Sequence, residues 1–486
     1  MKLYDLFSEI RKIDFEDREV SDVTDNSSKI KKDCVFVCVK GGSFDGHTVA
    51  GEALAKGAAA VVTERDLGLE RQIIVENTRK CYGELCAAWF DHPERKMKFI
   101  GVTGTNGKTT MTNVIKKIIT ECGHKAGLIG TIQNEIGDEV VQTANTTPMA
   151  YEYMNLLSRM AEEGCDTVVM EVSSFGLVQH RIGPTHFDIS VFTNLTQDHL
   201  DYHGTMEEYY KAKKMLFEIS DIAVINTDDE YGRRLYSEIS TEKYSFSRKH
   251  EADFRADGIS LSNDGTSFNL SFKNSSTDVK MKMTGAFNVE NVTAAFAACT
   301  KFGIPSEKIL SVISSYPGVK GRCEIIPTGK DFTVICDYAH TPDAVTNILC
   351  SVKEYCSGRL ICLFGCGGNR DSKKRPLMAK AAAEYSDLVI VTSDNPRDED
   401  PEAIINDILT GLEGISVGYI VVTDRREAIY RALSIAEKND IIVLAGKGHE
   451  DYQILKNNEH IHFDEREVVA DGIKLLNSLN YNKRNK

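Results

Sequence analysis

Residues 99–110 join an apolar strand, a glycine-rich turn and the sequence Lys-Thr-Thr. Glycines let backbone N–H groups turn toward phosphate oxygens, and a helix N-terminus adds partial positive charge. Lys108 supplies a point charge for phosphates, and the Thr109 hydroxyl is a ligand for Mg²⁺. The pattern predicts a strand, a phosphate-binding loop and then a helix, whose apolar stripe has the spacing of Met111, Val114, Ile115, Ile118, Ile119 and Cys122.

The loop is a variant of the usual phosphate-binding pattern. Val102 stands where the strict G-x-x-x-x-G-K-[ST] motif has its first glycine, and Gly104 lies three residues before Gly107 instead. A glycine turn that only caps a helix is the alternative, but it explains neither Lys-Thr-Thr nor the preceding strand. We therefore expect a nucleoside triphosphate on the loop residues Gly104, Thr105, Asn106, Gly107, Lys108, Thr109 and Thr110.

Acidic and imidazole side chains follow two further apolar strands. Glu171 ends the run Val168-Val169-Met170, where a carboxylate can hold Mg²⁺; a solvated strand-end glutamate is the alternative. Residues 194–204 hold two carboxylates and the imidazoles of His199 and His203. Such a cluster is typical of a metal or acid–base site, although His203 can also cap a helix.

The segment 209–217, Tyr-Tyr-Lys-Ala-Lys-Lys-Met-Leu-Phe, carries three lysines at helical spacing. On residue types alone this pattern is typical of a solvated helix face, with the lysine stems lying along apolar surface.

Length and composition limit the class of protein. At 486 residues the chain should form about three domains, and a net charge of −14 argues against a nucleic-acid-binding or anionic-membrane surface. The 13 cysteines include no C-x-x-C pair, and no apolar run reaches transmembrane length. The N-terminus is charged where a signal peptide is apolar. We expect a cytoplasmic protein with reduced thiols and no membrane insertion.

The order of predicted elements indicates α/β domains. We expect domains at 1–95, 96–328 and 329–486, with a linker near residues 91–95. A β-hairpin segment is expected within 253–283, where Asn-Asp-Gly separates alternating residues. Strands that alternate with helices imply parallel sheets, and we expect them at 99–103, 167–171, 188–193, 223–226, 332–337, 360–364, 388–392 and 441–445.

The twelve residues of the loop resemble those of the Mur ligases, ATP-dependent enzymes that form amide bonds in peptidoglycan precursors. Further segments resemble the family in its order: 145–148 (Asn-Thr-Thr-Pro), 171–174 (Glu-Val-Ser-Ser), 285–291 (Gly-Ala-Phe-Asn-Val-Glu-Asn), 321–324 (Gly-Arg-Cys-Glu) and 337–342 (Asp-Tyr-Ala-His-Thr-Pro). The resemblance implies three domains: an N-terminal UDP-sugar-binding domain, a central P-loop ATPase-type parallel sheet, and a C-terminal Rossmann-like doubly wound domain that binds the amino acid.

The resemblance also assigns roles to residues. Lys213 matches a lysine that CO₂ carbamylates, and the carbamate would join His199 in binding a second Mg²⁺, while Thr109 and Glu171 hold the first. Asn291 and Asp337 would face adenosine, and Arg322 the phosphates. Lys108, Glu171, His199, Lys213 and Arg322 would be catalytic. The UDP-N-acetylmuramoyl-L-Ala-D-Glu site would comprise Asp25, Ser27, Asn145, Thr146, Thr147, Ser173, Gln179 and Arg181.

Two segments depart from the family pattern: Asn26-Ser27-Ser28 replaces the usual Asp-Ser-Arg, and Phe175 replaces a histidine. In the third domain, Asp394-Asn395-Pro396-Arg397 resembles the motif of members that add meso-2,6-diaminopimelate. An arginine fork can bind its distal carboxylate, which lysine lacks. A plain Asn-Pro turn is the alternative. The remaining contacts implied for this amino acid are Arg370, Gly446 and Glu450.

The resemblance therefore implies a monomeric ligase that uses ATP and Mg²⁺ to join diaminopimelate to the UDP-linked dipeptide through an acyl phosphate. Three alternatives stay open: a lysine-adding member of the family, a folylpolyglutamate synthetase, and a nucleotide-binding switch that hydrolyses ATP without joining anything. The segment 394–397 disfavours the first, and the separate N-terminal module disfavours the second.

Overall fold

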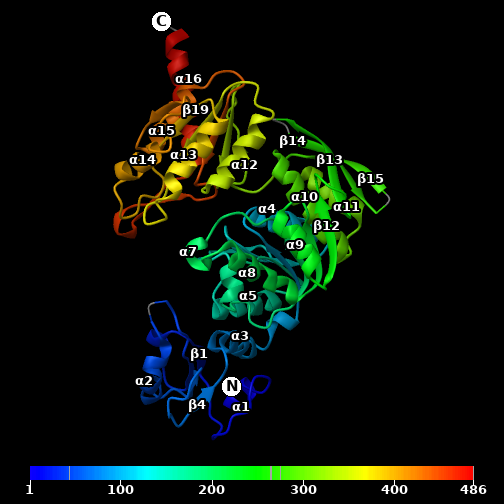
Figure 1. Cartoon of the computed structure of the whole chain (residues 1–486), viewed down its shortest axis with the longest axis vertical. Helices are drawn as coiled ribbons and strands as arrows, with labels where there is room; N and C mark the ends of the chain where they lie inside the picture. The colour runs from blue at the N-terminus through cyan, green and yellow to red at the C-terminus, as the bar shows by residue number, and fades with distance from the viewer. Residues whose placement is uncertain (43, 263–264, 274, 485–486) are drawn as a thin grey trace. The chain divides into compact units, whose positions relative to one another are not determined.

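The computed structural model describes residues 1–42, 44–262, 265–273 and 275–484. The chain forms two compact units, and Figure 1 labels their elements. The first unit comprises residues 1–195, 199–246 and 294–309, and the second comprises 196–198, 247–293 and 310–486.

The N-terminal part of the first unit is built on a parallel sheet in the order β1-β2-β3-β4. Its strands are β1 (Asp22–Thr24), β2 (Cys34–Val37), β3 (Ala60–Thr63) and β4 (Gln72–Ile74). The helices are α1 (Leu3–Leu6), α2 (Ala50–Ala55) and α3 (Thr78–Trp89), with 3₁₀ turns η1 (Ser27–Lys29), η2 (Gly46–Val49) and η3 (Pro93–Arg95).

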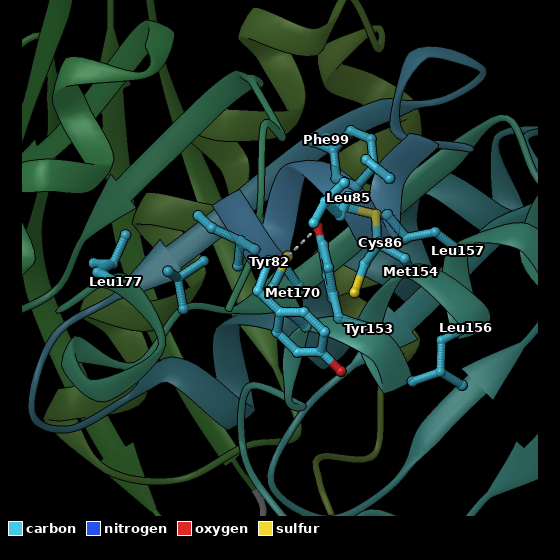
Figure 2. Packing of buried hydrophobic residues seen from close by; sticks show 14 of the residues in the cluster. Tyr82, Leu85, Cys86, Phe99, Tyr153, Met154, Leu156, Leu157, Met170 and Leu177 are labelled. Atoms are coloured by element: carbon cyan, nitrogen blue, oxygen red, sulfur yellow. Dashed lines mark hydrogen bonds between the residues drawn. The ribbon is translucent and has the colours of Figure 1, made fainter. Parts of the chain in front are cut away.

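The segment expected as a linker is packed instead. Glu94 is buried and its carboxylate lies 3.0 Å from His92 Nδ1, while Arg95 pairs with Glu9. Helix α3 packs on α5 (Ala150–Glu162) in one apolar core that continues into the central sheet. Figure 2 shows this core, with Tyr82 and Leu85 of α3 close to Tyr153 of α5. Burial of these side chains therefore holds the N-terminal sheet against the central one.

The central sheet has six parallel strands in the order β12-β11-β10-β5-β9-β6, followed by antiparallel β7 and β8. The strands are β5 (Lys98–Thr103), β6 (Ala126–Ile129), β7 (Asn134–Ile136), β8 (Glu139–Val141), β9 (Thr167–Glu171), β10 (Phe187–Phe192), β11 (Ser220–Asn226) and β12 (Glu242–Ser247). The helices besides α5 are α4 (Lys108–Glu121), α6 (Ser174–Val178), α7 (Leu200–His203), α8 (Met206–Glu218) and α9 (Glu230–Glu238).

Helix α4 confirms the predicted amphipathic pattern. Met111, Val114, Ile115, Ile118 and Ile119 are all buried, and the helix ends at Glu121. These residues repeat at helical spacing and lie on one face. The helix therefore packs along the sheet with its N-terminus at the end of β5.

In the second unit, the strands β13 (Phe254–Ser262), β14 (Gly265–Phe272) and β15 (Ser275–Met281) pair with one another in antiparallel fashion. This confirms the expected hairpin segment, although Asn263 and Asp264 of its Asn-Asp-Gly turn lie outside the described residues. Two helices follow along the chain, α10 (Ala286–Phe302) and α11 (Ser306–Ser315).

The C-terminal sheet has the order β16-β17-β21-β18-β19-β20, parallel except for β16. Its strands are β16 (Glu324–Ile326), β17 (Thr333–Asp337), β18 (Leu360–Phe364), β19 (Leu388–Val391), β20 (Gly418–Val421) and β21 (Ile441–Ala445). The helices are α12 (Pro342–Lys353), α13 (Lys374–Tyr385), α14 (Pro401–Leu409), α15 (Arg425–Ile435) and α16 (Glu465–Arg484). Strands β22 (Tyr452–Ile454) and β23 (His460–His462) form a hairpin around η4 (Lys456–Asn458).

These parallel-rich sheets confirm the predicted α/β class, with a doubly wound C-terminal sheet. All 13 cysteines, each within the described residues, are free. Cys122, Cys350, Cys356 and Cys366 are half-buried and the others are buried. Among the described residues, no helix is both long and apolar enough to cross a bilayer.

Candidate active site

The phosphate loop lies at the carboxyl end of β5, between the neighbouring strands β9 and β10. Gly104 and Gly107 have φ of +149° and +87°, where side chains are strained. A Cβ atom at Gly104 would also lie 1.8 Å from Thr193 Oγ1. The turn therefore needs glycine at 104 for both its backbone conformation and its close approach to the segment after β10.

Hydrogen bonds fix the loop and its lysine. Asn106 N donates to Asn194 Oδ1 at 2.9 Å, which ties the loop to the end of β10. The Lys108 ammonium donates to the carbonyl oxygens of Gly104 and Thr105 at 3.0 and 2.9 Å. The amine is thus held on the loop itself, close to the N–H groups at the start of α4.

Glu171 and Thr109 meet beside this loop. The Thr109 hydroxyl donates to Glu171 Oε2 at 3.1 Å, and Thr131 donates through its N–H to Oε1 at 2.9 Å and its hydroxyl to Oε2 at 3.0 Å. Glu171 is 1% exposed and makes no salt bridge within the described part of the chain. A buried carboxylate next to a hydroxyl is a donor set that fits Mg²⁺. The solvated-glutamate alternative does not hold.

Lys213 is buried next to the same loop. Its Nζ donates to the Gly104 carbonyl at 2.8 Å and lies 4.6 Å from the centre of the Tyr209 ring. The side chain is 2% exposed, whereas Lys211 and Lys214 pair with glutamates at the surface of α8. The solvated-face alternative therefore holds for those two lysines and not for Lys213.

Aromatic rings surround His199. Its ring lies edge-on to Phe175 and Tyr209, with centroid distances of 5.2 and 6.2 Å, and His203 stacks on Tyr209 at 4.9 Å. Burial lowers the pKa of His203, and the nearby Lys213 lowers it further. Within the described residues, no three His, Cys, Asp or Glu side chains cluster to hold a metal ion.

Thr147 connects Glu171 to the residues predicted for the dipeptide. Its hydroxyl donates to the Glu171 carbonyl and accepts from Ser173 N, both at 3.0 Å. Arg181 donates to the Thr147 carbonyl at 2.9 Å and to Gln179 Oε1 at 2.8 Å. These side chains form one hydrogen-bonded row leading away from the phosphate loop.

That row leads to a small pocket between α3 and the start of α5. Burial raises the pKa of the Asp25 carboxyl, which faces Arg79 and Tyr82 there. The lining residues are Asp25, Val39, Arg79, Tyr82, Met149, Ala150, Gln179 and Arg181. Five predicted residues are outside this lining. Thr147 and Ser173 belong to the row, Ser27 opens η1, the Asn145 carbonyl accepts from Thr143, and the Thr146 and Thr131 hydroxyls are hydrogen-bonded at 3.0 Å.

In the second unit, Asp337 ends β17 and accepts two backbone hydrogen bonds. Cys323 N and Ala339 N donate to its carboxylate at 2.7 and 2.8 Å. Burial raises the pKa of Asp337, although the charge of Arg322 opposes this. The Arg322 guanidinium lies 4.7 Å from the centre of the Tyr338 ring.

Asn291 also lies in the second unit, on α10. Its side chain is 5% exposed and donates to Asn288 Oδ1 at 3.2 Å. The residues predicted for adenosine thus belong to the second unit, and the phosphate loop belongs to the first.

The segment 394–397 packs against the loop after β18. Gly368 N donates to the Asn395 carbonyl, and Arg397 Nη1 donates to the Gly368 carbonyl, both at 2.9 Å. A Cβ atom at Gly368 would lie 1.9 Å from the Pro396 oxygen. Arg397 itself has φ of +52°. The two loops therefore fit together only with a glycine at 368.

The same segment meets the loop after β21. Asn395 Nδ2 donates to Glu450 Oε2 at 3.0 Å, and the fully buried Lys447 donates to Asn395 Oδ1 and to Glu450 Oε2 at 2.8 Å. Gly446 has φ of +117°, and a Cβ atom there would lie 2.8 Å from Asp394 Oδ2. Three loops at the carboxyl ends of neighbouring strands thus converge.

Arg370 and Arg397 bring two positive charges to this point. Burial lowers the pKa of Arg397, and the charge of Arg370 lowers it further. Within the described residues, neither side chain forms a salt bridge, and Arg370 is exposed. Two neighbouring guanidinium groups without a carboxylate partner are suited to an anionic ligand.

Three family profiles match successive parts of this chain. They are the Mur ligase family catalytic domain over residues 19–89, the Mur ligase middle domain over 102–299, and the Mur ligase glutamate ligase domain over 321–448.

Full-length relatives are similar as well. The UDP-N-acetylmuramoyl-L-alanyl-D-glutamate--2,6-diaminopimelate ligase of Clostridium tetani is 44% identical over 94% of this chain and 96% of its own. The Bacillus cereus protein of the same name is 42% identical over 97% and 98%. The chain belongs to the Mur ligase family. It is accordingly an enzyme of the ligase class.

Solved structures have the fold of this Mur ligase. A structure titled UDP-N-acetylmuramoyl-L-alanyl-D-glutamate--2,6-diaminopimelate ligase has a TM-score of 0.73 and 32% identity over 98% of this chain and 99% of its own. MurF from Acinetobacter baumannii has a TM-score of 0.60 at 18% identity over 95% of each chain, which shows the fold alone.

Sequence reasoning did not single out three residues of this Mur ligase that contact the predicted site. Thr131 binds Glu171, Asn194 binds the phosphate loop, and Lys447 binds Asn395. Thr131 and Asn194 each follow the end of a parallel strand by two residues, and Glu171 is the last residue of another. The same strand-end rule would have found them.

Proposed function

We propose that this Mur ligase uses ATP to join meso-2,6-diaminopimelate to UDP-N-acetylmuramoyl-L-Ala-D-Glu, the reaction for which its Clostridium tetani and Bacillus cereus relatives are named. The relatives' names support this reaction, since they match nearly the whole chain at 42 to 44% identity. Diaminopimelate and the UDP-linked dipeptide are therefore the first substrates to test.

The observation that carries the choice of amino acid is the pair Arg370 and Arg397. These two cations lack a carboxylate partner in the described residues and stand beside Asn395 and Glu450. The distal carboxylate of diaminopimelate would supply the missing anion, whereas lysine would bring a third cation. A lysine-adding enzyme would leave the arginines unpaired at an energetic cost.

Chemistry would proceed in two steps. The D-Glu γ-carboxylate attacks the γ-phosphorus of ATP to give an acyl phosphate and ADP. An uncharged amino group of diaminopimelate then attacks the acyl carbon, a proton leaves the nitrogen, and phosphate departs from the tetrahedral intermediate. Lys108 and Arg322 would balance charge on the transferred phosphoryl group. Positioning by the protein would supply most of the acceleration.

Mg²⁺ fits the donor set of Thr109 and Glu171, and when bound it would screen negative charge on the phosphates. A second Mg²⁺ would need His199 and a carbamate on Lys213. The Lys213 amine would attack CO₂, form an N–C bond and release a proton. Its burial beside the phosphate loop supports this role, because a buried amine favours its uncharged form.

The remaining roles follow the proposed domains 1–95, 96–328 and 329–486. The UDP-linked dipeptide would occupy the pocket of Asp25, Gln179 and Arg181 and the row through Thr147. Asn291 and Asp337 would face adenosine. We also infer a reducing, cytoplasmic location from the 13 free thiols.

The deciding experiment is an amino-acid panel assayed with the UDP-linked dipeptide and ATP, with ADP release as the readout. We expect ADP only when both the dipeptide and diaminopimelate are present. Equal kcat/KM for lysine would contradict the choice of amino acid. ADP release with ATP alone would support a switch in place of a ligase.

A further inference from the structure

A buried ion pair lies behind the segment 394–397. Arg425 begins α15 and Glu465 begins α16, and both side chains are 0% exposed. Arg425 Nε and Nη2 lie 2.9 and 2.8 Å from Glu465 Oε1. The other oxygen, Oε2, accepts from the Cys336 thiol at 3.1 Å. Both oxygens of the carboxylate are therefore occupied inside the second unit.

The same guanidinium reaches two of the loops that converge at the predicted amino-acid site. Arg425 Nη2 donates to the Ala445 carbonyl at 2.9 Å, and Nη1 donates to the Ser393 carbonyl at 3.3 Å. Ala445 directly precedes Gly446, and Ser393 directly precedes Asp394. One planar group thus sets the separation between the starts of the loops 394–397 and 446–450.

Burial of such a pair is not explained by stability. Removing two charges from water costs free energy that their attraction only partly returns, so apolar residues of similar volume are often as stabilising. A fork of fixed geometry, by contrast, can hold two carbonyl groups and a carboxylate at once. The contacts of Arg425 match this second property.

We propose that Arg425, held by Glu465, is a positioning residue for selection of the amino-acid substrate, an inference that rests on the proposed function. It keeps the loop carrying Arg397 at a fixed distance from the loop carrying Glu450. The site then accepts a ligand with a distal carboxylate and rejects one without it.

The test uses the full-length variants Arg425→Lys and Glu465→Gln. Lysine keeps the charge but cannot hold both carbonyls, and glutamine removes the balancing charge. We expect KM for diaminopimelate to rise about 10- to 100-fold, because small displacements of a positioned group have effects of this size. KM for ATP should stay unchanged. In both variants the ratio of kcat/KM for diaminopimelate to kcat/KM for lysine should decrease.

Arg359→Lys is the matched control. Arg359 and Asp440 directly precede β18 and β21 and pair at 2.7 Å, and Arg359 also binds the Ile435 carbonyl. This pair lies at the amino ends of the strands, away from the loops 394–397 and 446–450. It should lower Tm without changing KM for diaminopimelate.

If Arg425→Lys and Glu465→Gln behave like this control, with a lower Tm and an unchanged KM for diaminopimelate, the ion pair has only a structural role and the inference is overturned. Failure of both variants to fold would overturn it as well. Neither result would contradict the proposed function. An unmodified enzyme that does not use diaminopimelate would overturn the proposed function, and this inference with it.

Discussion

At the scale of one residue, substitution of Lys108 tests whether the loop 104–110 binds phosphate. Its ammonium donates to the Gly104 and Thr105 carbonyls of the loop and does not belong to an apolar core, so Lys108→Ala should fold normally. Loss of one charge contact at the transition state should reduce kcat about 10²- to 10³-fold. Lys116→Ala is the control, because Lys116 lies on the same helix and pairs with Glu135 instead. Near-normal ADP formation by a folded Lys108→Ala would refute the loop's assignment.

Lys213 distinguishes a carbamate from a plain buried lysine. Lys213→Ala should be inactive and should regain part of its activity when a small carboxylate is added, since the additive can replace the anion. Lys214→Ala, which only loses a surface pair with Glu238, should stay active without any additive. Steady-state ADP release measures both. An active Lys213→Ala without additive would remove the carbamate from the mechanism.

Arg397 carries the specificity prediction. Arg397→Ala should raise KM for diaminopimelate sharply, while KM for ATP stays nearly unchanged. The difference in kcat/KM between diaminopimelate and lysine should become smaller. Sites that bind a charged group reject analogues without it by about 10⁴- to 10⁵-fold. Arg397→Ala should therefore lose most of the discrimination between diaminopimelate and lysine. Arg431→Ala, an exposed arginine on α15, is the control and should leave both constants unchanged.

At the scale of the element, the turns before and after α4 need glycine for different reasons. The turn before α4 needs it for its backbone conformation and for lack of space, and the turn after α4 needs it for the backbone conformation alone. Gly104 and Gly123 both have positive φ, but only a Cβ at Gly104 meets another atom, Thr193 Oγ1 at 1.8 Å. Gly123→Ala should cost about 1 kcal/mol of stability and keep ATP binding. Gly104→Ala should lose ATP binding as well. Chemical denaturation and calorimetric titration with ATP separate the two effects.

Elements with a strong local signal were predictable from sequence. The strands 167–171, 360–364 and 441–445 have the predicted bounds, because each is a short apolar run that is buried on both faces of a parallel sheet. The burial of Lys213 was not predictable from its helix, since its partner Gly104 lies 109 residues away in sequence. Residue types alone described its neighbours Lys211 and Lys214 correctly.

The candidate site shows the same division. Strand-end residues such as Glu171 and the segment 394–397 carry their own motifs, so sequence reasoning found them. Arg425 carries no such motif at the site, because it acts from the start of a helix on backbone carbonyls that only the folded sheet brings together. A residue that contacts backbone carbonyls is hard to recognise from the sequence, because every residue type has the same backbone carbonyl.

For the whole molecule, one buried histidine gives stability a defined pH dependence. Burial, with Arg322 and other nearby cations, lowers the pKa of His449 to about 3 from the usual 6.5. Between these values the unfolded chain binds a proton that the folded chain does not. The stabilising contribution is therefore complete above pH 6.5 and decreases as pH falls, by at most about 1.4 kcal/mol per pH unit.

His449→Gln should remove this part of the slope. Urea denaturation at pH 7 and pH 5 should show a smaller loss of unfolding free energy for the variant than for the unmodified chain. His462 is the contrast, because Glu467 raises its pKa and its contribution is lost as pH rises. Equal slopes with and without His449 would refute the prediction.

The distribution of thiols gives this molecule a native pair of labelling sites. Only thiolates react readily with maleimides, and burial raises the pKa of Cys366 to about 12 and raises that of Cys356. Of the four half-buried cysteines, this leaves Cys122 in the first unit and Cys350 in the second as the accessible pair. A donor and an acceptor dye on those two positions would report by energy transfer how the separation of the units responds to ATP, without any engineered cysteine.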